Sequence, residues 1–327
     1  MPPTQFAPPR WLRNPHLQSI LTSVLPRRWF VARRSRALVA ASRDELVDCG
    51  DGVRLLGHYA PCPDGRGELV VLLHGWEGSA ESQYVRSVAT ELRGAGYDVF
   101  RLNLRDHGPT HHLNPELFHS CRIAEVVGAI AEIARRFPSR RLALVGYSLG
   151  GNFALRVAVR APAAGIPLAQ VIAICPVLDP AHTMQRLEHG TWIYRNYFVL
   201  KWRRSLLRKR RAWPDLYDLD ELLESRRLTA MTAQLVRRYS GYADIHSYLA
   251  GYAITGAALA PLTVPCHLLM ALDDPLIPAG DLTRLAAPAA LTVETVSRGG
   301  HCGFLDSLGG PSWADRRVLE ILGGAGA

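Results

Sequence analysis

The sequence predicts an α/β fold: a mostly parallel, eight-stranded sheet that is flanked by helices and carries an inserted helical cap. Three observations predict it. Short apolar runs alternate with stretches of helical length, as in strand–helix–strand units. The apolar runs are continuous, which is typical of strands covered on both faces. Residues 180–260 interrupt the alternation with a helical pattern and no obvious strand.

The eight strands begin with an antiparallel hairpin, expected over 45–49 and 53–59 because Gly50-Asp51-Gly52 is a turn sequence. Six further strands are expected at the apolar runs 68–74, 97–103, 141–147, 170–175, 266–271 and 291–296. Helices are expected at about 80–95, 116–136, 149–161, 279–287 and 312–322.

These elements divide the chain into three parts. A basic N-terminal segment covers 1–44, the α/β core covers 45–179 and 261–327, and the cap covers 180–260. An insertion at the carboxyl ends of parallel strands would lie over the crevice where such sheets bind ligands. The alternative is a helical excursion that packs elsewhere.

The composition excludes a disordered chain, because 48% of the 327 residues are hydrophobic and 20% are charged. The net charge of +9 is concentrated in two segments. Residues 1–43 contain eight arginines and no acid, residues 201–211 contain seven basic residues and no acid, and the rest of the chain carries −6. Such segments form either solvated arginine-rich faces or surfaces for an anionic membrane or acidic substrate. Nucleic acid is not expected, because a groove-reading element would be basic throughout.

The six cysteines have no C-x-x-C spacing and form no Cys/His cluster of zinc type. We therefore expect reduced, packed cysteines in an intracellular protein. The N-terminus has no apolar stretch of signal-peptide length, and no run approaches the ~20 residues of a membrane span. The sequence thus favours a cytoplasmic protein, with peripheral membrane contact left open and the oligomeric state not indicated.

Ser148 lies in Gly146-Tyr147-Ser148-Leu149-Gly150, a G-x-S-x-G pattern. The pattern follows a predicted strand and begins a predicted helix, which is the context of a nucleophile elbow. Side chains at the two glycines would collide in so sharp a turn. Ser148 is therefore the predicted nucleophile, and the alternative is a glycine-rich turn with an idle serine.

His301 and an aspartate are the predicted partners of Ser148. A serine hydroxyl needs a base at neutral pH, and His301 follows the last predicted strand in a glycine-rich loop. Asp273 and Asp274 follow the strand at 266–271, so one of them could orient the imidazole. We favour Asp274, which precedes Pro278 by four residues, and keep Asp273 as the alternative acid. The order Ser, Asp, His is that of the α/β-hydrolase fold.

Backbone N–H groups are the predicted oxyanion donors. Leu149 N–H lies at the helix start after the nucleophile, and Trp76 N–H lies in the loop after the strand at 68–74. His74, in the same loop, is expected to be structural.

The segment 103–112 is dense in His and Asp, which could bind zinc. A loop rich in turn-forming residues explains it more simply, with Arg105 or Asp106 bracing the catalytic loops. No metal and no cofactor are therefore expected.

These residues together resemble the YheT-like branch of the α/β-hydrolases, which includes plant and mammalian members. Residues 14–20 (NPHLQSI) resemble the signature N-P-H-L-Q-T-I of that branch. Residues 74–78, 146–152, 273–275 and 299–304 are similar to its H-G-L-x-G, G-Y-S-L-G-G-N, D-D-P and G-G-H-x-G-F motifs.

The resemblance covers most of the chain and implies a serine hydrolase that cleaves carboxylic esters, some relatives being phospholipases or short-chain esterases. Asp106 departs from it, because relatives usually carry glycine after the arginine. The cap is similar only around 239–259. Both departures lie where substrate would be selected, so the substrate class, a small-molecule or lipid ester, is not narrowed further.

The expected function is therefore ester hydrolysis through a Ser-His-Asp triad and an acyl-enzyme. A thioesterase or acyltransferase would use the same triad, and a non-catalytic, membrane-docking module is the alternative from a different class. Epoxide and haloalkane hydrolysis are excluded, because they need an aspartate where this chain has Ser148.

Overall fold

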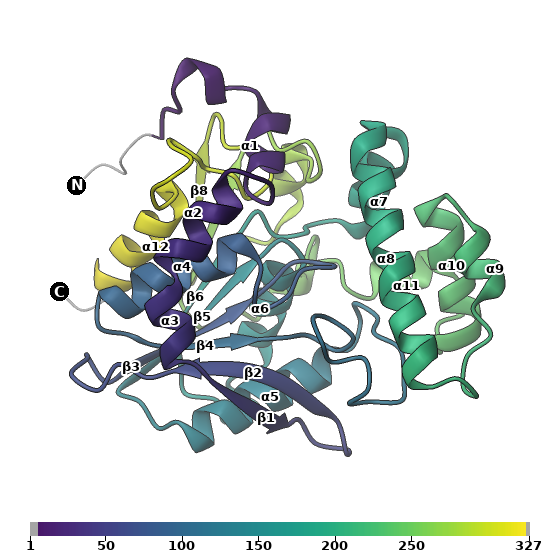
Figure 1. Cartoon of the computed structure of the whole chain (residues 1–327), viewed down its shortest axis with the longest axis horizontal. Coiled ribbons are helices and arrows are strands. Elements are labelled where there is room, and N and C mark those ends of the chain that lie inside the picture. Colours follow the sequence, from purple (N-terminus) through teal and green to yellow (C-terminus); the bar gives the residue numbers. More distant parts are fainter. Residues whose placement is uncertain (1–5, 325–327) are drawn as a thin grey trace.

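The sheet that the sequence predicts is present in the computed structural model, which describes residues 6–324 (Figure 1). Its eight strands are ordered β1-β2-β4-β3-β5-β6-β7-β8, with β1 and β2 antiparallel and the others parallel. The strands are β1 Arg43–Asp48, β2 Arg54–Ala60, β3 Glu68–Leu73, β4 Asp98–Leu102, β5 Arg141–Tyr147, β6 Leu168–Ile174, β7 Cys266–Ala271 and β8 Leu291–Val296. The mostly parallel eight-stranded prediction is confirmed.

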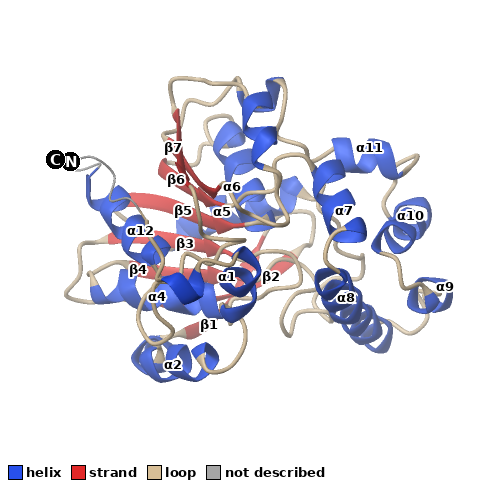
Figure 2. Cartoon of the chain, turned by 90° about the horizontal axis from the view of Figure 1, so that it is seen from above, coloured by secondary structure: helices blue, strands red, loops and turns tan. Residues whose placement is uncertain are grey.

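Helices cover both faces of this sheet (Figure 2). On one face lie α4 (Gln83–Gly94) and α12 (Trp313–Gly324), and on the other lie α5 (Ile123–Arg136) and α6 (Leu149–Arg160). Strand β3 shows why: Leu69, Val71 and Leu73 pack with α5 and α6, while Val70 and Leu72 pack with α4 and α12. Successive side chains of a strand point to opposite faces, so a strand between two helical layers is apolar throughout.

The N-terminal segment forms short helices that pack against the core. They are η1 (Arg10–Leu12), α1 (Pro15–Leu21), α2 (Arg27–Arg34) and α3 (Arg36–Ala41). Leu12, Val31 and Leu38 are buried, and the buried Arg27 guanidinium donates to the carbonyl of Gly310. The interpretation of this basic segment as a wholly solvated face is therefore wrong, because Arg27 is buried.

Between β6 and β7 the chain forms five α-helices and one 3₁₀ turn, with no strand in the fully described residues 180–260. These are α7 Pro180–His189, α8 Trp192–Ala212, α9 Asp220–Glu224, α10 Leu228–Tyr239, α11 Ile245–Ala250 and η2 Ala257–Leu259. Asp179 caps the first of them, because its carboxylate accepts from the N–H groups of Ala181 and His182. The helices α7–α10 extend to one side of the sheet (Figure 1).

Two helix predictions need correction. The helix predicted over 116–136 begins only at Ile123, because the preceding residues form a loop that Arg105 and Lys209 hold through the carbonyl of Glu116. The helix predicted over 279–287 is a 3₁₀ turn, η3 (Ala279–Arg284). Leu285, which follows this turn, has an extended backbone and forms a bridge with Gly256, so no α-helix continues there.

All six cysteines are free thiols, and four of them are buried. Among the described residues, the helices are too short or too polar to cross a bilayer.

Candidate active site

Ser148 lies at the sharp turn between β5 and α6. Its backbone has φ 54° and ψ −118°, a strained left-handed conformation for a residue with a side chain. A Cβ at Gly146 would lie 2.2 Å from the carbonyl oxygen of Gly150, and one at Gly150 would lie 2.5 Å from that of His74. The collision expected from the sequence is therefore real, and it explains why both flanking positions are glycine.

His301 and Asp274 complete a hydrogen-bonded chain that ends at Ser148. His301 Nε2 lies 2.9 Å from Ser148 Oγ, and its Nδ1 lies 2.8 Å from Asp274 Oδ2. The other carboxylate oxygen of Asp274 accepts from the N–H groups of Leu276 and Ile277. In the tautomer that donates from Nδ1 to the fully buried carboxylate, Nε2 accepts a hydrogen bond from the Ser148 hydroxyl.

Asp273 has a different place. Its Oδ1 accepts from the N–H of Gly300 at 2.9 Å, so it holds the loop that carries His301 rather than the imidazole. Burial raises the pKa of the Asp273 carboxyl above its ordinary value. Of the two candidate acids, Asp274 alone contacts the His301 ring.

Trp76 and Leu149, which carry the two predicted oxyanion donors, both line the cavity that contains Ser148. Within residues 6–324, neither the N–H of Trp76 nor that of Leu149 donates a hydrogen bond to another protein group. The approach of the Trp76 loop to the serine favours a small residue at Gly75, because a Cβ there would lie 3.2 Å from Ser148 Cβ. These two N–H groups are thus free to bind an oxygen at the serine.

His74 is held inside its own loop. Its Nδ1 bonds the carbonyl of Gly75 at 2.8 Å, and its Nε2 accepts from the N–H of Leu104. Burial lowers the pKa of His74 well below its ordinary value, so the ring is neutral. It does not contact Ser148.

The N-terminal helix α1 holds the His301 loop from a second side. Ser19 Oγ accepts from the N–H of His301 at 2.8 Å, and Gln18 exchanges hydrogen bonds with the backbone of Leu305. A Cβ at Gly300 would lie 2.8 Å from Ser19 Oγ. The motif at 14–20 was singled out from the sequence, but its role was missed. Nothing local indicates that residues almost 300 positions apart are neighbours.

A cavity of about 730 Å³ opens above Ser148 and His301. Its wall is formed by α1, the loops after β3 and β4, and helices α7, α8, α10 and α11. Aromatic side chains are prominent in it: the Trp76 ring stacks on Phe198 with centroids 5.1 Å apart, and Trp202 packs edge-on against Trp76. Such a space suits an apolar ligand group.

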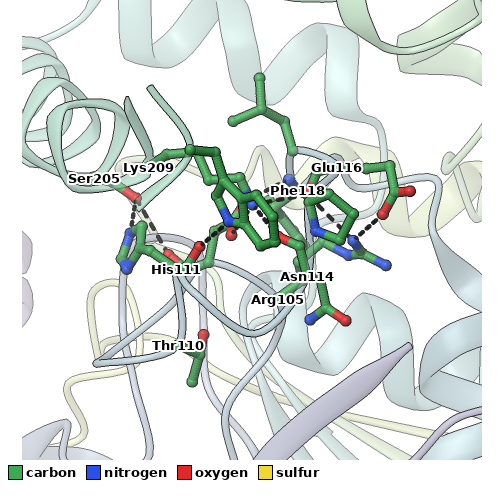
Figure 3. Close-up of polar contacts among 12 residues, drawn as sticks. Arg105, Thr110, His111, Asn114, Glu116, Phe118, Ser205 and Lys209 are labelled. Atoms are coloured by element: carbon green, nitrogen blue, oxygen red, sulfur yellow. Dashed lines mark hydrogen bonds and ion pairs between the residues drawn. The ribbon is translucent and has the colours of Figure 1, made fainter. Parts of the chain in front are cut away.

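The C-terminal half of α8 is fixed to the loop after β4 by a buried ion pair (Figure 3). Lys209 Nζ lies 2.8 Å from Asp106 Oδ1 and donates to the carbonyls of Asn114 and Glu116. The other oxygen of Asp106 accepts from the N–H of Phe118, which itself lines the cavity. Lys209 is fully buried, so the second basic segment is not a wholly solvated face either.

Arg105 continues this cluster. Its guanidinium donates to Glu125 Oε2 at 2.9 Å and to Glu116 Oε2 at 2.8 Å. Asp106 adopts φ 56°, a conformation that favours glycine, which fits its departure from the resembled motif. Arg105 and Asp106 thus brace a loop whose later residues reach the cavity.

Two groups of metal-capable side chains occur in the described part of the chain, and neither includes residues of 103–112. In one, Asp179 and Asp281 are bridged by Arg284, which already compensates their charge, beside His182. The other joins Cys175 and Cys302 to His301, whose two ring nitrogens are engaged by Asp274 and Ser148. Burial raises the pKa of Cys302, which disfavours a thiolate ligand.

The family model of the alpha/beta hydrolase family matches residues 70–308. The chain belongs to this family. It is 25% identical over 97% of its length to YheT of Escherichia coli, of which it covers 93%. It is 23% identical over 84% of its length to the monoacylglycerol lipase of Saccharomyces cerevisiae, of which it covers 64%.

Solved structures show the same fold. The esterase Pf2001 of Pyrococcus furiosus matches with a TM-score of 0.60 at 17% identity, over 86% of this chain and 90% of that one. A bacterial membrane phospholipase A matches with a TM-score of 0.58 at 16% identity, over 95% of both chains. The family model and the similarity to YheT confirm the YheT-like α/β-hydrolase predicted from the sequence motifs.

Proposed function

We propose that this protein is a carboxylic ester hydrolase that acts through Ser148, His301 and Asp274. The observation that carries the proposal is the hydrogen-bonded chain from Asp274 through His301 to Ser148, which ends at a strained elbow facing the cavity. The family membership and the esterases and lipases among the relatives and neighbours support the same reaction class.

In the proposed first half-reaction, Ser148 Oγ attacks the ester carbonyl carbon while its proton moves to His301 Nε2. The carbonyl oxygen becomes an oxyanion that the N–H groups of Trp76 and Leu149 bind. Asp274 stabilises the imidazolium that forms. The bond to the alcohol then breaks, and His301 gives its proton to the departing oxygen.

In the second half-reaction, water attacks the acyl-enzyme. His301 takes a proton from that water and returns it to Ser148 Oγ as the acid leaves. A thioester would follow the same course, and transfer to an alcohol in place of water would make the enzyme an acyltransferase. Adding an alcohol and measuring the ratio of acid to transferred ester separates these outcomes.

We infer that the substrate is a lipid-type ester and that the helices of 180–260 act as a cap over it. The cavity volume, its aromatic wall and the lining residues from α8 support this inference. The lipases among the relatives support it independently.

A series of p-nitrophenyl esters from acetate to palmitate tests the substrate class, with the Ser148→Ala variant as the control. We expect kcat/KM to be higher for medium or long chains than for acetate. A steady fall of kcat/KM beyond butyrate would contradict a lipid-type substrate but not ester hydrolysis.

A further inference from the structure

Large apolar side chains are exposed on both sides of the cavity mouth. On one side, Leu25 and Trp29 expose 71% and 54% of their surface; on the other, Trp192 exposes 64%. Val24, Ile193 and Leu200 are also exposed, so each side presents several apolar groups. These six residues are called the mouth surface below. Exposed apolar groups that gather beside an opening mark an interaction site rather than ordinary surface.

The two sides belong to the same opening. Val24 and Ile193 both line the cavity that contains Ser148, although one follows α1 and the other lies in α8. A hydrogen bond of 3.0 Å between His16 Nδ1 and Tyr194 Oη links α1 directly to the start of α8. Both views place α1 on the side of the core that faces the inserted helices (Figures 1 and 2). A partner on the mouth surface would therefore lie directly over the route to Ser148.

The charge beside the mouth surface is positive. Helices α2 and α8 contain arginines and lysines and no acidic residue. Arg28 lines the cavity mouth, Arg33 lies over the Trp29 ring, and Arg204 is exposed further along α8. Across residues 6–324, the ion pairs include none with these three arginines. Exposed tryptophan next to uncompensated arginine matches an interface of apolar chains below anionic phosphates.

We propose that the mouth surface docks on an anionic phospholipid bilayer. The tryptophan and aliphatic side chains enter the headgroup region, and the arginines of α2 and α8 bind lipid phosphates. The cavity then opens toward the bilayer, so a lipid ester enters without crossing water. This inference names the bilayer as the source of the substrate, and it rests on the proposed ester hydrolysis.

Vesicle sedimentation with the full-length Ser148→Ala protein tests the proposal without hydrolysis of the lipid. The vesicles are phosphatidylcholine alone, or phosphatidylcholine with 30% phosphatidylglycerol, at 50 and 500 mM NaCl. We expect binding to the anionic vesicles at 50 mM NaCl and a loss of about tenfold or more in partitioning at 500 mM or on neutral vesicles.

Paired variants locate the surface. Trp29→Ala with Trp192→Ala is expected to lower partitioning about tenfold, because two interfacial anchors are lost. Leu46→Ala with Val293→Ala is the matched control, since these exposed residues lie on β1 and β8 at opposite edges of the sheet. Arg28→Glu with Arg33→Glu should abolish the preference for anionic vesicles, whereas Arg135→Glu on α5 should not.

Three results would overturn the proposal: no binding to anionic vesicles at 50 mM NaCl, equal loss in the control pair, or a dimer in light scattering that the tryptophan variants dissociate. The last result would make the mouth surface an interface between copies. With Ser148 intact, the pair Trp29→Ala and Trp192→Ala should leave activity on a soluble ester unchanged, because neither tryptophan lines the cavity. Failure of the docking proposal is therefore distinguishable from failure of the proposed reaction.

Discussion

Two polar clusters of this protein are built differently: one reaches the cavity, and the other lies behind the cavity residue Phe118. The first is the chain Asp274–His301–Ser148, which ends at a partly exposed hydroxyl in the cavity wall. The second joins Asp106 to Lys209 and Arg105 to Glu125, with all four side chains buried. In the second, charges are compensated within the protein and no group is left for a substrate. A buried polar cluster can do chemistry only where one end reaches a cavity, so the first cluster should control rate and the second should control stability.

The largest expected effect is on the first cluster. Ser148→Ala and His301→Ala should each lower kcat by about 10⁶, and the double variant should lose no more than either single one, because the pair acts as a unit. Steady-state kinetics on a soluble ester measure this, with thermal unfolding as the companion. Multiplying losses in the double variant would contradict a single catalytic chain.

The acid comes next in magnitude. Asp274→Asn should lower kcat by about 10⁴, because the amide no longer holds the imidazole in the tautomer that accepts from Ser148. Asp273→Asn is the matched control, since Asp273 contacts the backbone of Gly300 instead of the ring, and should lose far less. The reverse order of the two losses would exchange the roles of the two aspartates.

The second cluster should respond in stability. Lys209→Met leaves the Asp106 carboxylate buried without its cation, at a cost of about 3–5 kcal/mol in the free energy of unfolding. Asp106→Gly together with Lys209→Met removes both charges and restores a residue suited to φ 56°, so it should cost less than the single change. Urea unfolding of the wild-type protein and the two variants measures this. A double variant less stable than Lys209→Met would show that the pair is not a charge-compensating unit.

Ser19 extends the comparison, because it contacts the backbone of His301 and takes no direct part in the proposed reaction. Ser19→Ala removes the acceptor of the His301 N–H and should lower kcat about tenfold, with KM nearly unchanged. The neighbouring Ser23→Ala is the control. If kcat falls only together with thermal stability, Ser19 contributes to packing and does not position His301.

A pH-dependent change in stability is expected from Glu77 in the cavity wall. Burial raises the pKa of its carboxyl to about 8, so the folded protein holds a proton that the unfolded chain releases near 4.5. The unfolding free energy should therefore fall as the pH rises from about 4.5 to 8. Glu77→Gln should flatten this part of the profile, as urea midpoints at pH 6 and 8.5 would show. An unchanged slope would mean that Glu77 is ionised in the folded state.

Most of the core could be predicted from the sequence because its signals are local. Apolar runs such as 141–147 and 266–271 coincide with β5 and β7. The sharp turn at Gly-Tyr-Ser-Leu-Gly is predictable because side chains at its two glycines would collide with the backbone. Asp274 could be preferred over Asp273 only through a turn spacing, because adjacent residues share the same local pattern.

The contacts between distant segments could not be predicted. In the sequence, Lys209 is one of seven basic residues in 201–211, and nothing local distinguishes it from the others. It alone of the seven is fully buried, where it pairs with Asp106 in a loop about 100 positions away. Ser19 meets His301 for the same kind of reason. A family resemblance can single out a motif that contains such a residue. Its contacts follow only from the packing of helix α1 or α8 on the core.

Labelling with a fluorophosphonate probe, read by intact mass, tests the central claim most directly. An activated serine attacks the probe phosphorus, expels fluoride and stays phosphonylated, whereas an ordinary serine does not react. We expect one adduct on the wild-type protein and none on Ser148→Ala of equal thermal stability. A folded wild-type protein that gains no adduct, or a Ser148→Ala protein that gains one, would contradict an Asp274–His301–Ser148 catalytic chain.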